Sequence, residues 1–218
     1  MPDVRLGDRV LAARADGSLG FEDVYLNTHK DHASSAPYVE LTLVSGRSLS
    51  LSPRHFIPVA AGSDGAWEVR VAKGADELVA GDFVWSRSPS GAMVLDRVTT
   101  AQTKVALGAF NPLTMNGTIV VDGVVASAHS DWFLDGIVSA ETQTKVYQAI
   151  LAPVRLAYQA LGPQRMETVT ESWGVVDAVR TATTPRVGGG GAGWIWAGLA
   201  VLVIVGGSLA WRRRAAAH

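Results

Sequence analysis

The sequence has no cysteine among its 218 residues. A chain without a thiol forms no disulfide, binds no zinc ion or iron–sulfur cluster through sulfur, and offers no cysteine nucleophile from its own residues. Charged residues are also scarce, at 18%, and the formal net charge is −1. Because binding to nucleic acid depends on concentrated positive charge, this composition and the lack of a long basic run argue against a nucleic-acid partner.

One long apolar run stands near the C-terminus. Residues 194–211 carry no charge, have tryptophan at both ends, and are followed at once by the arginines 212–214. As a helix the run would reach about 27 Å, close to the thickness of the hydrocarbon core of a bilayer. It therefore predicts a single transmembrane helix, and the alternative is a buried hairpin of a globular core.

The arginines after this run favour a cytoplasmic tail, which would place the preceding chain outside the cell or in a lumen. A tail-anchored arrangement would reverse this orientation. The first residues, MPDVRLGDRV, contain no signal-peptide core. We therefore expect either an unusual export route or a protein that extends further at its N-terminus.

The first part of the chain reads as β-structure. Alternating or β-branched runs predict strands at Arg9–Ala13, Tyr38–Val44, Ser48–Leu51, Trp67–Val71, Phe83–Ser86, Ala92–Val98 and Thr118–Ala126. Dipeptides that tolerate a positive φ separate them: Asp16-Gly17, Ser45-Gly46, Asp64-Gly65, Ser90-Gly91 and Asn116-Gly117. Strands at this spacing indicate a closed or sandwiched all-β domain.

From residue 131 to residue 161 the apolar spacing becomes helical, with an interruption at Pro153 and a stop at Gly162-Pro163. A glycine-rich stretch then has the composition of a flexible linker. We divide the chain into a β-domain (1–130), a helical extension (131–180), a linker (181–193), the transmembrane helix (194–211) and a basic tail (212–218).

Part of the β-domain is repeated. A shift of 74 residues lays LGDRVLAARADGSLGFEDV, residues 6–24, over AGDFVWSRSPSGAMVLDRV, residues 80–98, without a gap. Each copy reads as a Gly-Asp turn, a strand, a turn at glycine and a returning strand. Turn residues recur by chance in β-proteins, but the ungapped spacing favours a duplication and a pseudo-twofold fold.

Several motifs in this order resemble the Hint domain, and within it the C-terminal autoprocessing domain of Hedgehog proteins. They are GDRVLAARADGSLGFEDV at 7–24, Leu51–Phe56, which is similar to the family's Thr-x-x-His block, PLTMNGTIVVDGVVAS at 112–127, and Leu151–Leu156. The third is the most specific, because Hedgehog domains carry a near-identical Leu-Thr-x-x-Gly-Thr-Ile-Val-Val segment that ends in Ala-Ser-Cys. The resemblance covers residues 3–160.

The resemblance implies an all-β, pseudo-twofold Hint fold and a self-cleavage reaction. In the family, the cysteine that begins the domain attacks the preceding carbonyl and forms an internal thioester. A second nucleophile, a sterol in Hedgehog itself, then releases the upstream polypeptide. The implied partners are therefore the upstream polypeptide in cis, a sterol or lipid nucleophile, and a membrane.

By position, the resemblance assigns His55 and Ser52 to the first step. A histidine that titrates near neutral pH can protonate the departing amine, and a hydroxyl beside it can hold the scissile group distorted. Ser52 replaces the family threonine and keeps the hydroxyl. The alternative for His55 is a hydrogen-bonded histidine at the end of a strand.

His29 falls where Hedgehog proteins have the aspartate that activates the sterol hydroxyl, although a slip of two residues would put Asp31 there. A neutral imidazole can accept a hydroxyl proton, so we expect His29 to act as general base, with water or another nucleophile competing with sterol. The alternative is a solvated polar loop. His29, Asp31 and His32 lack helical periodicity and a clear third ligand, so we expect no metal and no other cofactor.

Two other segments have alternative interpretations. Asn116-Gly117-Thr118 is a formal glycosylation sequon, but its position fits a hairpin turn better. Residues 131–161 could lie on a membrane surface, because in Hedgehog-like proteins the region after the Hint core contacts the lipid substrate.

The family nucleophile itself is missing. It stands well before the Gly-Asp turn in the family, whereas six residues precede Gly7, and Ala128 occupies the place of the second Hedgehog cysteine. We therefore expect a truncated reading of a longer protein, inactive as given. Two hypotheses remain open: an autoprocessing domain whose cysteine lies upstream, and a degenerate, non-catalytic, membrane-anchored domain with a binding or structural role.

Overall fold

The structure is a computed structural model that describes residues 1–130 and 139–172. Its strands are β1 (Arg9–Ala13), β2 (Leu19–Leu43), β3 (Ser48–Leu51), β4 (Phe56–Ala60), β5 (Val71–Gly74), β6 (Phe83–Arg87), β7 (Met93–Thr114), β8 (Thr118–Val121) and β9 (Val124–Ser127). Its helices are α1 (Ala140–Ile150), α2 (Ala152–Leu161) and α3 (Pro163–Ser172). Residues 1–145 and 146–218 form two compact units, which we describe separately.

The membrane prediction falls outside the described residues, as do the linker and the basic tail. Within the described ranges, none of the helices has both the length and the apolar character needed to cross a bilayer.

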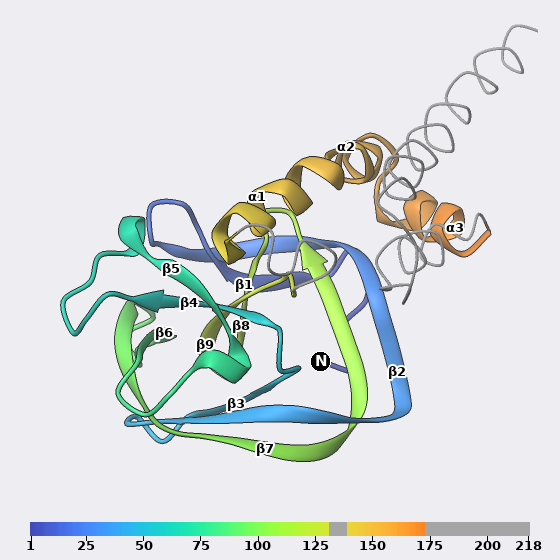
Figure 1. Ribbon diagram of the computed structural model, residues 1–218. Coiled ribbons are helices and arrows are strands. Elements are labelled where there is room, and N and C mark those ends of the chain that lie inside the picture. The colour runs from blue at the N-terminus through green and yellow to red at the C-terminus, as the bar shows by residue number, and fades with distance from the viewer. Residues whose placement is uncertain (131–138, 173–218) are drawn as a thin grey trace, which may run out of the picture. The chain divides into compact units, whose positions relative to one another are not determined.

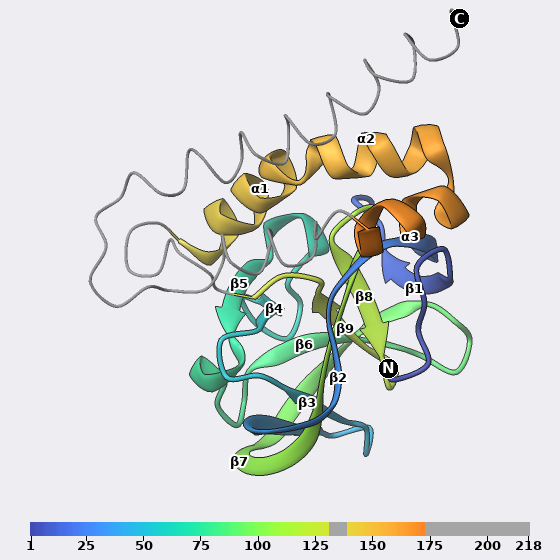
Figure 2. The ribbon, with the colours of Figure 1, turned by 90° about the vertical axis from the view of Figure 1, so that its right-hand side faces the viewer.

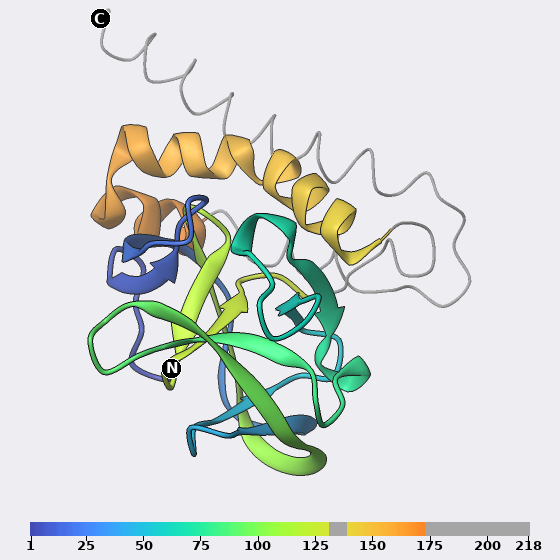
Figure 3. The same ribbon diagram turned by 90° about the vertical axis from the view of Figure 1, so that its left-hand side faces the viewer.

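The strands pair in the order β1-β2-β7-β6-β4-β5, with β3 on β2, β9 on β6 and β8 on β9. The pairings between these strands are antiparallel. Figure 3 shows β6 and β7 as one hairpin, with β4 and β5 beside it. The prediction of an all-β domain followed by short helices is therefore confirmed.

Two strands are far longer than the sequence predicts. β2 has 25 residues and β7 has 22, and they pair along most of their length through several register shifts. Figures 1 and 2 show them running together, and in Figure 1 both turn through the same bend. The polar segment inside β2 breaks the alternation of apolar residues, so the sequence marks only the two ends of β2, the returning strand of the first repeat copy and Tyr38–Val44.

The internal repeat is confirmed by the hydrogen bonds of its two copies. β1 and β6 begin at Arg9 and Phe83, which are 74 residues apart, the shift found in the sequence. Before β1, the Gly7 amide donates to the Val24 carbonyl at 2.8 Å; before β6, the Gly81 amide donates to the Val98 carbonyl at 2.9 Å.

The aspartates of the two Gly-Asp turns also accept equivalent hydrogen bonds. An Asp8 carboxylate oxygen accepts from the Arg5 amide at 2.8 Å. An Asp82 carboxylate oxygen accepts from the Val79 amide at 3.0 Å. Each aspartate thus satisfies a backbone donor three residues earlier, which explains why both copies keep this residue type.

The segment Trp67–Val71 was predicted to be a strand, and this is wrong. Residues Trp67–Val69 form a 3₁₀ turn, and β5 starts only at Val71. The reason is the Trp67 side chain: its indole packs edge-on against Trp85, with ring centroids 5.1 Å apart, and its N–H donates to the Arg14 carbonyl at 2.9 Å. These contacts anchor Trp67 in the core and take the backbone out of the sheet.

The segment Thr118–Ala126 was predicted to be one strand, and it is two. Asp122 and Gly123 have φ values of 51° and 81° and make the tight turn between β8 and β9. Strand β4 was not predicted, because its five residues are all buried and show no alternation.

In the helical region, α2 ends at Leu161 and Gly162 forms its C-cap, as predicted. However, Gly162-Pro163 was predicted only to end the helical region, whereas Pro163 begins a further helix, α3. Proline suits the first turn of a helix, where its missing N–H is not needed. The part of the predicted helices at 131–138 lies outside the described residues.

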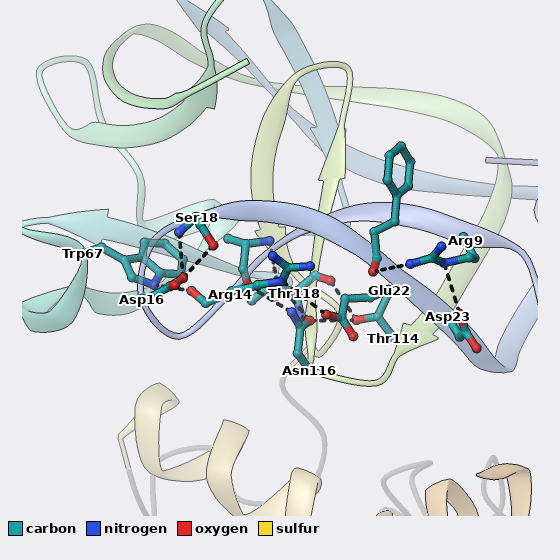
Figure 4. Close-up of polar contacts among 12 residues, drawn as sticks. Arg9, Arg14, Asp16, Ser18, Glu22, Asp23, Trp67, Thr114, Asn116 and Thr118 are labelled. Atoms are coloured by element: carbon teal, nitrogen blue, oxygen red, sulfur yellow. Dashed lines mark hydrogen bonds and ion pairs between the residues drawn. The ribbon is translucent and has the colours of Figure 1, made fainter. Parts of the chain in front are cut away.

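A polar cluster fastens β1 to the loop before β8 (Figure 4). The Thr118 hydroxyl accepts from the Ala13 amide at 3.0 Å and donates to the Ala13 carbonyl at 2.7 Å. The Asn116 side-chain amide donates to the same carbonyl at 3.0 Å. Its oxygen accepts from the Thr118 amide at 3.1 Å, which closes the turn at Gly117, where φ is 81°. These contacts match the turn interpretation of the sequon.

We predict that Thr118→Val destabilises the fold by about 1–3 kcal/mol, because it removes the hydroxyl that serves both backbone groups of buried Ala13. Chemical denaturation followed by circular dichroism measures this loss. Thr103→Val is the matched control, since Thr103 is an exposed threonine in β7, and its effect should stay within about 0.5 kcal/mol. Equal stability of the two variants would contradict a structural role for the Thr118 hydroxyl.

Candidate active site

A cavity of about 340 Å³ is lined by residues of β2, β3, β7, β8 and β9 and of the loops beside them. Its size is that of a small-molecule pocket. All three predicted site residues, His29, Ser52 and His55, lie on its wall. They come from β2 and from the loop between β3 and β4, which are separated along the chain, so the fold brings the predicted residues together.

His55 is held between the turn that follows β3 and the end of β9. Its amide donates to the Ser52 carbonyl at 3.0 Å, which closes the turn after β3. It also forms an isolated antiparallel bridge with Ser130, just beyond β9. Its ring Nε2 lies 2.8 Å from the Ser127 carbonyl oxygen. The His55 backbone is therefore held by Ser52 and Ser130, and its ring is held by Ser127.

The bond to Ser127 also decides which ring nitrogen of His55 carries the proton. A carbonyl oxygen can only accept, so Nε2 is the donor, and Nδ1 keeps its lone pair in the neutral ring. Burial lowers the pKa of His55 below its ordinary value, and the hydrogen bond to Ser127 opposes this shift in part. The ring is thus neutral at neutral pH, with Nδ1 ready to accept a proton.

Ser52 is an exposed residue on the cavity wall, three positions before His55. Its backbone carbonyl accepts from the His55 amide, and this turn does not need the side-chain hydroxyl. A serine hydroxyl can donate to a carbonyl oxygen or accept from an amide. Both properties suit a group that holds a scissile peptide bond next to a histidine.

The structure places His29, and not Asp31, at the cavity. The Asp31 carboxylate accepts from the backbone amide of Ala33 at 2.8 Å, and it also accepts from the hydroxyl and the amide of Ser34. The side-chain hydrogen bond from Ser34 is the main cause that lowers the Asp31 pKa, and the two backbone amides add to it. Asp31 thus shapes the irregular part of β2.

The possible metal cluster is not assembled. His32 packs its ring edge-on against Phe110, with centroids 5.0 Å apart, while His29 faces the cavity and Asp31 caps the backbone. Across residues 1–130 and 139–172, no three histidine or acidic side chains are grouped so that they could hold a metal ion.

Several polar residues of the cavity wall were not predicted, and Tyr38 and Asn111 are two of them. The Tyr38 hydroxyl donates to the Gly108 carbonyl across the β2–β7 pair. Asn111 lies directly opposite His29 in the same pair. Neither has a local signal in the sequence, although Asn111 directly precedes the Pro112–Ser127 motif. Ala128, at the place of the second Hedgehog cysteine, also lines the cavity.

We predict that His55 titrates below the ordinary histidine pKa of about 6.5. Unfolded chains then bind more protons than folded ones in this range, so the free energy of unfolding falls as the pH drops from about 7 through the lowered pKa. Urea denaturation across this range measures the slope, and NMR titration of the ring measures the pKa itself.

His55→Gln should flatten this dependence, whereas His32→Gln, which removes an exposed histidine outside the cavity wall, should leave it in place. A His55 pKa at or above the ordinary value would contradict the burial argument.

Comparisons with known proteins give a family match and relatives for this chain. Residues 1–173 match the Hint module family. Protein qua-1 of Caenorhabditis elegans is 31% identical over 140 residues, which cover 60% of this chain and 12% of that protein. Protein hedgehog of Drosophila virilis is 26% identical over 190 residues, which cover 85% of this chain and 35% of that protein. The chain thus covers only part of the length of each of these two relatives, at most about a third.

Among solved structures, a DnaB intein from Synechocystis sp. PCC 6803 has a TM-score of 0.47 and 15% identity, over 58% of this chain and 82% of the intein. The family match, the two relatives and the confirmed repeat lead to one conclusion: the chain belongs to the Hint module family.

Proposed function

We propose that this Hint module carries out protein self-cleavage through a thioester, with release of an upstream polypeptide to a sterol, water or another nucleophile. The observation that carries this proposal is the grouping of His55, Ser52 and His29 around one cavity, with His55 held as a neutral base. A histidine kept at a strand end for packing alone would not need two further polar groups at the same cavity.

In the first step, a cysteine thiol attacks the carbonyl carbon of the residue before it. His55 Nδ1 accepts the thiol proton and passes it to the amide nitrogen as the C–N bond breaks and the C–S bond forms. The lowered pKa helps the second half of this transfer, because a protonated ring with a low pKa is a strong acid. Ser52 holds the scissile group while this happens.

In the second step, the thioester is attacked by the acceptor. A hydroxyl or water is a weak nucleophile until a base takes its proton, and His29 lies on the cavity wall to do so. The carbonyl carbon then forms a C–O bond, the C–S bond breaks, and the thiol is regenerated.

The thiol must come from outside the given sequence, because none of its 218 residues is cysteine. Ser52 and His55 are both retained and lie on the wall of the same cavity, which supports the autoprocessing hypothesis over the degenerate, non-catalytic one.

We also propose that the protein is a single-pass membrane protein, with the Hint module on the extracellular or lumenal side. The support is the uncharged run 194–211 with its following arginines. Such an anchor would keep the module close to lipid acceptors.

We predict that the chain, expressed with its upstream reading frame and a reporter, releases the reporter when dithiothreitol is added, since thiols cleave thioesters. His55→Ala should slow this release by about 10²-fold or more. His32→Ala, outside the cavity wall, should release the reporter at the wild-type rate. Gel electrophoresis and mass spectrometry of the products measure both rates.

An upstream frame without a cysteine, or a wild-type protein that stays intact in thiol, would overturn autoprocessing. The degenerate domain would then be the better description.

A further inference from the structure

One part of the cavity wall is built around Gly108 of β7. Five consecutive residues of this strand, 108–112, line the cavity. Gly108 has a φ of 92°, a conformation that residues with a side chain rarely adopt. Its carbonyl accepts a hydrogen bond from the Tyr38 hydroxyl, which fixes the β7 backbone at this point. In the pairing with β2, residues 32–34 stand opposite Gly108 alone, so the ladder is irregular here.

The Phe110 ring lies directly against this glycine. A Cβ atom added at Gly108 would come within 2.5 Å of the ring, far inside van der Waals contact. The ring also packs edge-on against His32, with centroids 5.0 Å apart. His32 is exposed and lies outside the cavity wall, whereas Phe110 is part of that wall. The Phe110 ring thus stands between the cavity and an exposed side chain, with a contact on each side.

Phe110 belongs to the same part of the wall as the proposed base of the second step. In the β2–β7 register, His29 is opposite Asn111. Phe110 is opposite Lys30, one position further along. Successive residues of a strand are about 3.3 Å apart along its axis, so Phe110 starts close to the place where the acceptor meets His29. Phe110 is also the largest apolar side chain on the cavity wall.

We propose that Phe110 is a specificity-determining residue, whose ring limits the size of the acceptor that reaches the thioester. This inference rests on the proposed function. A ring held by Gly108 and His32 is a fixed wall, and acceptors that are small enough to fit beside it can approach the carbonyl carbon. A single methylene group in a pocket changes discrimination by about tenfold or more, and the Phe110 ring is larger than that.

The test uses the chain with its upstream reading frame and two uncharged thiols, 2-mercaptoethanol as the small acceptor and 1-thio-β-D-glucose as the bulky one. The added thiolate forms a C–S bond with the thioester carbonyl carbon, the bond to the cysteine sulfur breaks, and that sulfur takes the proton of the added thiol. Mass spectrometry of the released polypeptide identifies each adduct and measures its rate of formation. Each rate is divided by the rate of the same thiol with a soluble model thioester, which removes differences in intrinsic reactivity.

Phe110→Ala should raise the ratio of the bulky-thiol rate to the small-thiol rate by about tenfold. Phe110→Leu, which keeps apolar bulk, should give a smaller rise, and it provides the same test if the alanine variant does not fold. A loss of folding or of thioester formation lowers both rates together and leaves the ratio unchanged. Phe21→Ala is the matched control, because Phe21 is an exposed phenylalanine of β2 outside the cavity wall. Its ratio should equal that of the wild type.

A wild-type protein that reacts equally well with both thiols, or Phe110 variants with the wild-type ratio, would overturn the inference and leave the proposed function standing. A wild-type protein that neither thiol cleaves would overturn both.

Discussion

The pairing of β2 with β7 is the constraint on which the site depends. Each of these strands begins in one copy of the repeat, and their register sets which side chains reach the cavity. A slip of one residue would turn every side chain of one strand to the opposite face. The register shift between Asn27 and His29 makes Thr28 the extra residue, and Thr28 in turn orients Asn111. Chain pairing and site chemistry are therefore set by the same few residues.

The first half of the β-domain supplies the candidate side chains His29, Ser52 and His55, and the second half orients the His55 ring. His55 and Ser52 follow β3, but the proton on the His55 ring is placed by the carbonyl of Ser127, after β8 and within β9. Because that contact is made by backbone, its role cannot be recognised from residue types. The pKa of His55 follows from the same placement, since the cavity wall that holds the ring also removes it from water.

Much of the fold could be predicted, because its signals are local. The Gly-Asp turns, the positive-φ glycines and the 74-residue shift mark β1, β6 and the starts of β2 and β7. The prediction of a strand at Trp67–Val71 failed because it depended on contacts between distant residues. The Trp67 indole contacts Arg14 and Trp85, and the backbone at Trp67 is not part of the sheet. In the site, His29, Ser52 and His55 followed from family resemblance. Asn111 did not, because only the cross-strand register brings it to His29.

The two halves of the β-domain differ in the length of one connection between strands. Between β3 and β4 the chain uses residues 52–55, which include Ser52 and His55, whereas the corresponding step from β8 to β9 is the two-residue turn Asp122-Gly123. One connection thus brings two polar side chains to the cavity while its counterpart is a minimal turn, so a repeated strand plan gives a cavity wall that is not symmetric.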